Sequence, residues 1–160
     1  MRVLGRMSQS ADVTGTPGWV AALLRQPWIM PALRACLVSA YVLGGVTKLT
    51  HFHAAIDEQI HFGLHPGWCW AVLAIFVEIA GSLCVVFNIF TWLGAGALAA
   101  LTLVAMLVAN DFWNLQGQAQ FMAMNSFFEH LGLIAAFAMV TYVTTADRRS
   151  VTQQTQTGNR

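Results

Sequence analysis

Glu78 is the residue whose type and position most clearly suggest chemistry, because a carboxylic acid lies at the centre of an apolar segment, residues 68–87. A carboxylate at mid-depth in a membrane-spanning helix costs about 2.5–3.5 kcal/mol on insertion scales. The side chain must therefore face other helices, be protonated or be paired. If residue 39 marks the centre of the segment 28–49, Arg34 is the nearest cation and the predicted partner. Two interpretations remain open: the pair fixes the register of two helices, or Glu78 binds a quinone carbonyl or relays a proton.

A second set of polar residues lies where the apolar segments end. This outer polar cluster consists of Lys48, Asp111, Glu129 and His130. Lys48 closes the first apolar segment, Asp111 follows the third, and Glu129 and His130 lie about one and a half turns inside the fourth. Antiparallel packing would bring all four to a similar depth, which predicts a salt bridge between Lys48 and either Glu129 or Asp111. The cluster is either the solvated end of a helical bundle or the vestibule of a ligand-binding site.

Metal and haem chemistry find little support in the histidines. His51, His53, His61 and His65 lie between the first two apolar segments. No thiolate or carboxylate stands at a fixed spacing from them, as a zinc site would require. A haem held by two histidines would need them inside the apolar segments, and only His130 lies within one. The sequence therefore predicts no metal site, and it contains no self-contained catalytic motif.

The composition explains why these polar residues stand out. The chain has 160 residues, of which 57% are hydrophobic and 9% are charged, and its mean hydropathy is +0.60. Soluble domains carry roughly 25% charged residues, so this chain has too little charge to cover a surface that faces water. The net charge of +1 also excludes a nucleic-acid binder, which would need a basic surface. One domain embedded in a lipid bilayer fits the length and composition.

The polar residues lie in or beside four apolar segments of about 20 residues, the length that crosses a bilayer. An all-α, antiparallel bundle of four transmembrane helices is predicted, with Asn88 and Ile89 as a minimal turn and residues 51–67 as a loop. Small residues in the second and third segments allow close helix packing and self-association. Residues 1–27 form a tail with an interfacial segment at 19–24, and the polar tail 146–160 is expected to fray. The four spans are residues 28–49, 68–87, 90–109 and 123–145.

The distribution of lysine and arginine predicts the orientation. Outside the spans these residues occur in the two tails and are missing from the connecting loops. Cytoplasmic segments are enriched in positive charge. Both termini are therefore expected in the cytoplasm, with the histidine-containing segment and the segment after residue 109 on the other side.

The same residues, taken in order, resemble the DoxX family of four-helix bacterial membrane proteins. The resemblance covers about Pro31 to Thr144, and two positions depart from the family pattern: Asn110 stands where histidine is common, and Glu129 where lysine is common. The motifs that carry the resemblance are Arg34, Gly44-Gly45-x-x-Lys48-Leu49, Gly63-x-x-Pro66, Glu78-x-x-Gly81, Asp111-Phe112-Trp113 and Asn125-x-Phe127-Phe128-x-His130-Leu131.

The resemblance implies a protein of the bacterial inner membrane that is a partner of redox systems, since a related subunit belongs to a thiosulfate:quinone oxidoreductase. An accessory or quinone-contacting subunit is the function it favours, with quinone as a cofactor and redox proteins of the membrane or periplasm as partners. A small proton-linked transporter and a purely structural membrane protein are the alternatives. The candidate polar and ligand-binding residues are Arg34, Lys48, Glu78, Asp111, Trp113, Asn125, Glu129 and His130.

The orientation gives a prediction that can be tested in whole cells. In a background without the native cysteines, a cysteine at Thr50 or Gln116 should react with a thiol reagent that cannot cross the membrane. A cysteine at Ser150 should react only after the cells are opened. Mass-tagging of the labelled protein on a gel measures the outcome, and the opposite pattern would invert the topology.

Overall fold

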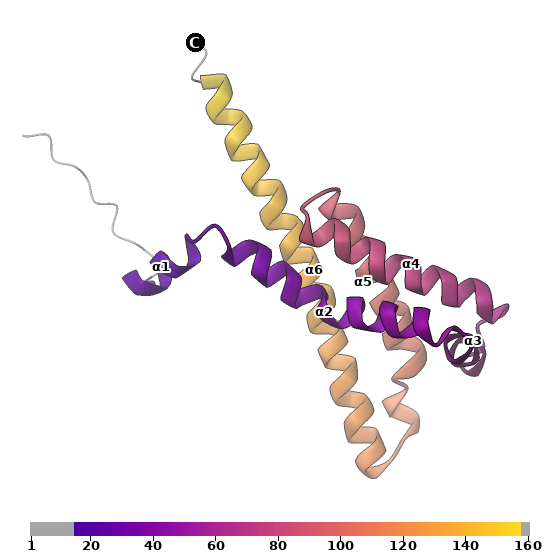
Figure 1. The fold of residues 1–160 in the computed structure, drawn as a ribbon. Helices are drawn as coiled ribbons and strands as arrows, with labels where there is room; N and C mark the ends of the chain where they lie inside the picture. The colour runs from indigo at the N-terminus through magenta and orange to yellow at the C-terminus, as the bar shows by residue number, and fades with distance from the viewer. Residues whose placement is uncertain (1–14, 158–160) are drawn as a thin grey trace, which may run out of the picture.

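The computed structural model describes residues 15–157, with side chains described as far as Ala146. This part of the chain is helical and contains no β-strand. Figure 1 shows the helices in order along the chain. They are α1 (Gly18–Leu24), α2 (Ile29–Thr50), α3 (Phe52–His61), α4 (Gly67–Val86), α5 (Thr91–Ala109), the short 3₁₀ helix η1 (Phe112–Asn114) and α6 (Gly117–Thr157).

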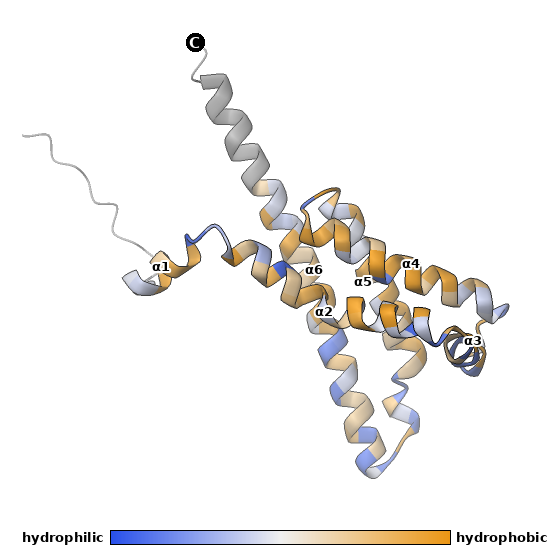
Figure 2. Cartoon of the chain, in the orientation of Figure 1, coloured by the Kyte–Doolittle hydropathy of each residue, from blue (hydrophilic) through white to orange (hydrophobic). Residues whose placement is uncertain are grey.

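Four of these helices are long and apolar enough to cross a membrane. They are α2, α4, α5 with the residues that follow it to Asn114, and α6 from Gly117 to Ala146. Figure 2 shows apolar residues along α2, α4 and α5 and a more polar beginning of α6. The predicted fold class is confirmed: the protein is an all-α, multi-pass membrane protein.

The helices associate mainly as neighbours along the chain. Helix α4 packs against both α2 and α5, and α5 packs against α6, whereas α2 and α6 have little contact. The connection between α4 and α5 is a tight turn at the predicted place, extended by one residue on each side to 87–90. Asn88 and Phe90 adopt positive φ angles of 58° and 49° in it. Left-handed residues reverse a chain within a few positions. The Thr91 hydroxyl donates a hydrogen bond of 2.9 Å to the Asn88 side chain and closes the turn.

The segment 51–67, predicted as a loop, instead contains helix α3. Its inner face repeats every three or four residues, with Ala55 buried and Ile56 and Gln59 half-buried, while Asp57 and Glu58 are exposed. That amphipathic repeat is typical of a helix lying on other elements. Helix α3 packs closely on the start of α4, since a Cβ added at Gly67 would lie 2.7 Å from Ile60 Cγ1.

The prediction that the polar tail frays after Thr145 is also wrong for the backbone, because α6 continues to Thr157. No proline or glycine interrupts the chain between Gly132 and Gly158. A helix already nucleated by packing can therefore extend at little cost per residue. At the other end of the chain, α1 coincides with the segment expected to be interfacial.

A small apolar core holds the four spanning helices together. Its fully buried members come from all four of them, and the Tyr41 ring meets the Phe137 ring edge-on at 5.5 Å. Two glycines bring α4 and α5 into close contact, since a Cβ added at Gly94 would lie 2.7 Å from the Gly81 carbonyl oxygen. Small residues allow such close approach where lipid provides no hydrophobic drive for association. The core residues are Val38, Val85, Ala95, Leu98 and Phe137.

Two glycines of α5 provide a matched test of this packing. Gly94→Ala should lower stability by about 1–3 kcal/mol, the typical cost of overpacking, because its Cβ would also meet Cys84 Cβ at 2.6 Å. Gly96→Ala should be neutral or slightly stabilising, because nothing lies within 4 Å of the added Cβ and alanine favours helix. Thermal unfolding in detergent measures both, and equal effects would contradict the close α4–α5 contact.

Candidate functional site

One stripe of residues along α2 faces the other helices. The members of this stripe recur at intervals of three and four, so they share one face of the helix. Charged residues stand at both ends of the stripe, and an apolar residue, a phenol and a glycine stand between them. In chain order they are Arg34, Val38, Tyr41, Gly45 and Lys48.

The polar members of this stripe connect α2 to three different helices. Arg34 Nη2 donates to the Thr144 hydroxyl of α6 at 3.0 Å, and Lys48 Nζ lies 2.5 Å from Glu78 Oε1 of α4. Tyr41 lies 2.6 Å from the Thr102 hydroxyl of α5. Because that hydroxyl donates its proton to a backbone carbonyl at 2.7 Å, Tyr41 is the donor in this pair.

The contact between Lys48 and Glu78 is a largely buried ion pair, with 22% of the lysine side chain and 8% of the glutamate side chain exposed. Glu78 Oε2 is buried and has no hydrogen-bond partner among the described residues. Two glycines of α2 provide the space: a Cβ added at Gly44 would lie 3.5 Å from Glu78 Oε2, and one at Gly45 would lie 3.2 Å from Glu78 Cβ. The carboxylate therefore lies directly against the backbone of α2.

The predicted pairing of Glu78 with Arg34 is wrong. It assumed that the centres of the first two spans lie at the same depth. The packing instead places Gly45 beside Glu78 and Ile79. Relative to the predicted alignment of residue 39 with Glu78, α2 is shifted along α4 by about six residues, or roughly 9 Å at 1.5 Å per residue. Lys48 thereby comes within reach of the carboxylate, and Arg34 lies far from it.

The outer polar cluster does not assemble as predicted, because its acidic members bind local partners. Asp111 accepts a hydrogen bond from Asn114, and Glu129 accepts one of 3.0 Å from Asn125, one turn earlier in α6. The expected salt bridge between Lys48 and Glu129 or Asp111 is therefore replaced by the pair with Glu78.

His130 differs from these acidic residues because its ring is held by the backbone of α6. Its Nδ1 lies 2.6 Å from the carbonyl oxygen of Ser126. A carbonyl can only accept, so Nδ1 carries a proton. In the neutral ring, Nε2 is then left as a hydrogen-bond acceptor.

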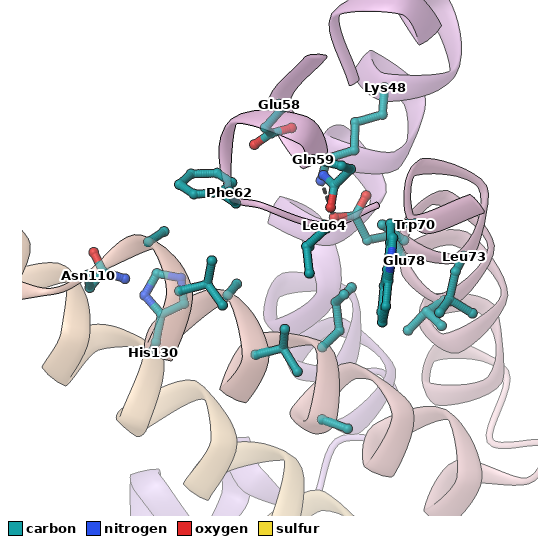
Figure 3. Close-up of a pocket in the computed structure, with 18 of the residues that line it drawn as sticks. Lys48, Glu58, Gln59, Phe62, Leu64, Trp70, Leu73, Glu78, Asn110 and His130 are labelled. Atoms are coloured by element: carbon teal, nitrogen blue, oxygen red, sulfur yellow. Dashed lines mark hydrogen bonds and ion pairs between the residues drawn. The ribbon is translucent and has the colours of Figure 1, made fainter. Parts of the chain in front are cut away.

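A cavity of about 600 Å³ brings three of the predicted residues, Lys48, Glu78 and His130, to one space. In Figure 3, His130 and Asn110 lie at one side of this cavity, and Glu78, Gln59 and Trp70 lie at the other. Apolar side chains of α4 and α5 form most of its wall. The polar residues of the lining are Lys48, Glu58, Gln59, Glu78, Asn110, Ser126 and His130.

The other predicted residues lie away from this cavity. None of Arg34, Asp111, Trp113, Asn125 and Glu129 is part of the lining. Trp113 is exposed, and so is the Asn125–Glu129 pair.

Sequence reasoning missed Glu58, Gln59 and Trp70. The first two belong to α3, and the amphipathic repeat of residues 52–61 could have revealed them. Trp70 resembles an interfacial anchor in the sequence, and only the position of α3 relative to α4 makes it part of a cavity wall. Asn110 stood out only as a departure from a family pattern.

The cavity is not closed off from the outer surface of the helices. Leu73, Val104 and Val108 line it and are also exposed large apolar residues. In a bilayer such surfaces face lipid. The space can therefore hold a molecule that is mainly apolar, has polar groups at its ends and enters from the membrane. Among the described residues, no three metal-ligating side chains come together.

The fold and the cavity define a class: a multi-pass helical membrane protein with a buried ion pair beside a mainly apolar cavity. The DoxX family model matches residues 29–111, more than half of the 160 residues, and the chain belongs to the DoxX family. The matched region contains Arg34, Lys48, Glu78 and Asp111 and ends before His130.

The chain is also similar to the inner membrane protein YphA of Escherichia coli (strain K12). The two are 20% identical over 115 residues, which is 72% of this chain and 82% of that protein. No solved structure matches the chain significantly.

The ion pair predicts strong coupling between its two residues. Lys48→Met leaves the charge of Glu78 buried, and Glu78→Gln leaves that of Lys48. Each single variant should therefore lower the free energy of unfolding by about 3 kcal/mol, and the double variant should recover much of that loss. The control is Arg34→Met combined with Glu78→Gln, which should be additive within error because these residues do not touch. Unfolding titrations in detergent measure both cycles, and coupling to Arg34 rather than Lys48 would contradict the observed register.

Proposed function

We propose that this chain is an inner-membrane subunit that binds a quinone in the cavity beside Lys48 and Glu78 and works with a partner redox protein. The observation that carries the proposal is the combination of a mainly apolar cavity, polar groups at both sides of it, and a wall of lipid-facing residues. The inner-membrane location is supported by four spanning helices and by a relative named as an inner membrane protein. The distribution of basic residues supports cytoplasmic termini.

The polar groups match the chemistry of a quinone headgroup. An ammonium group has three donors, and Lys48 directs one of them to Glu78, which leaves two for a quinone carbonyl. His130 Nε2 can accept from the hydroxyl of the reduced form, because Nδ1 binds the backbone. The cavity volume of about 600 Å³ lies within the 300–1,000 Å³ typical of small-molecule sites.

In this proposal the chain and its partner protein supply different parts of the quinone reaction. Reduction of a quinone to its hydroquinone takes up two electrons and two protons. The chain supplies the apolar cavity, the hydrogen-bond donors and groups that can exchange protons. The electrons are assigned to the partner protein.

A second candidate is proton-linked movement of a weak acid, and it rests on Glu78 Oε2, which is buried without a hydrogen-bond partner among the described residues. An unpaired carboxylate oxygen beside a cavity can take up and release a proton. Reconstituted vesicles that carry wild type but show no proton or solute flux would remove this candidate.

The experiment that tests quinone binding fills the cavity. Ala105 lines it and is exposed, so Ala105→Phe should occupy the space without disturbing the buried core. Ala138→Phe is the matched control, because Ala138 is exposed on α6 and is not part of the lining.

Purified protein is incubated with a photoreactive azidoquinone, and the labelled peptides are quantified by mass spectrometry. Wild type and Ala138→Phe should be labelled on α4 and α5, and Ala105→Phe should lose roughly tenfold in labelling, equivalent to about 1.4 kcal/mol of binding. Equal labelling of Ala105→Phe and wild type would refute quinone binding at this cavity.

A further inference from the structure

Arg34 is a buried cation with no role in the cavity. Only 7% of the residue is exposed, and Nη2 donates to the Thr144 hydroxyl at 3.0 Å. That hydroxyl donates its own proton to the Val140 carbonyl at 2.8 Å. It is a neutral group, so it does not compensate the charge of Arg34. Arg34 thus uses one of its five N–H donors within the described part of the chain.

The charge of Arg34 is uncompensated among the residues whose side chains are described. The ion pair found there joins Lys48 to Glu78, and Arg34 Nε is buried without a hydrogen-bond partner. Nη1 is not one of the buried unpartnered atoms, so it keeps contact with the surface. An unpaired cation inside a membrane domain is costly, which favours an anion bound from outside.

The depth of Arg34 places it within reach of lipid headgroups. It lies in the second turn of α2, roughly 7 Å from the start of the helix at Ile29. Trp28, just before that start, and Trp19 in α1 are exposed, as tryptophans at a membrane interface are. Arginine side chains near a helix end extend toward the headgroups.

We infer that Arg34 binds the phosphate of an anionic phospholipid in the leaflet that contacts the beginning of α2. A guanidinium presents donors in a planar fork that matches phosphate geometry. A lipid is favoured over free phosphate or a protein carboxylate because the adjacent residue Leu33 is apolar and exposed and suits acyl chains. This site lies on α2 and α6, away from the cavity, and does not depend on quinone binding.

The test uses the full-length protein in detergent with added phosphatidylglycerol, and native mass spectrometry counts the lipids that stay bound. Arg34→Gln should lose roughly tenfold in retention, or about 1.4 kcal/mol, and Arg34→Lys should lose less because it keeps the charge. Arg25→Gln is the matched control, since Arg25 is exposed just before α2, and it should retain the lipid. Phosphatidylcholine and inorganic phosphate should not replace phosphatidylglycerol.

Several outcomes would overturn the inference. Wild-type retention in Arg34→Gln would show that the lipid binds elsewhere, and displacement by inorganic phosphate would show a free-anion site. A protein that co-purifies through Arg34 without bound phosphatidylglycerol would identify a protein partner instead.

A further variant covers the case in which Arg34→Gln does not fold. Thr144→Val removes the one hydrogen-bond partner that Arg34 has among the described side chains and leaves the guanidinium in place. It should retain phosphatidylglycerol at least as well as wild type. A loss of retention in this variant would also overturn the inference.

Discussion

The structure depends on one electrostatic constraint: a carboxylate inside a bilayer has to be compensated by the protein, because no water is present to solvate it. Lys48 provides that compensation for Glu78. The contact requires the backbones of α2 and α4 to approach closely, and Gly44 and Gly45 provide the space beside the carboxylate. The ion pair and the glycine pair are therefore two parts of one arrangement, and neither explains the packing alone.

The relative position of α2 and α4 has consequences at both ends of α2. At one end Lys48 and Glu78 line a cavity that α3 and the beginning of α6 complete. At the other end Arg34 lies too far from Glu78 to pair and binds Thr144 of α6 instead. A single sliding of one helix along another thus separates the two cations of α2 into different environments. One cation is neutralised within the chain, and the other is not paired among the described side chains.

Much of the architecture could be predicted from the sequence. Segment length and hydropathy identify the four spanning helices, and Asn88 and Ile89 identify the tight turn, because these signals are local. The prediction failed where a short polar helix has little hydrophobicity, as in α3, and where a helix continues beyond the membrane, as in α6. The amphipathic repeat of residues 52–61 and the lack of proline and glycine between Gly132 and Gly158 were the signals that could have corrected both.

For the candidate site, the sequence alone identifies the residues that need an explanation. Glu78 stands out because the free-energy cost of inserting a carboxylate in a membrane depends on its depth, and Lys48 and His130 stand out because they lie inside the ends of spans. The packing of the helices is needed to see that Lys48 and not Arg34 binds Glu78, and that α3 joins α4, α5 and α6 around a cavity. The physical reason is that helix formation follows from local periodicity. The sliding of one helix along another is set by side-chain packing between residues far apart in the chain.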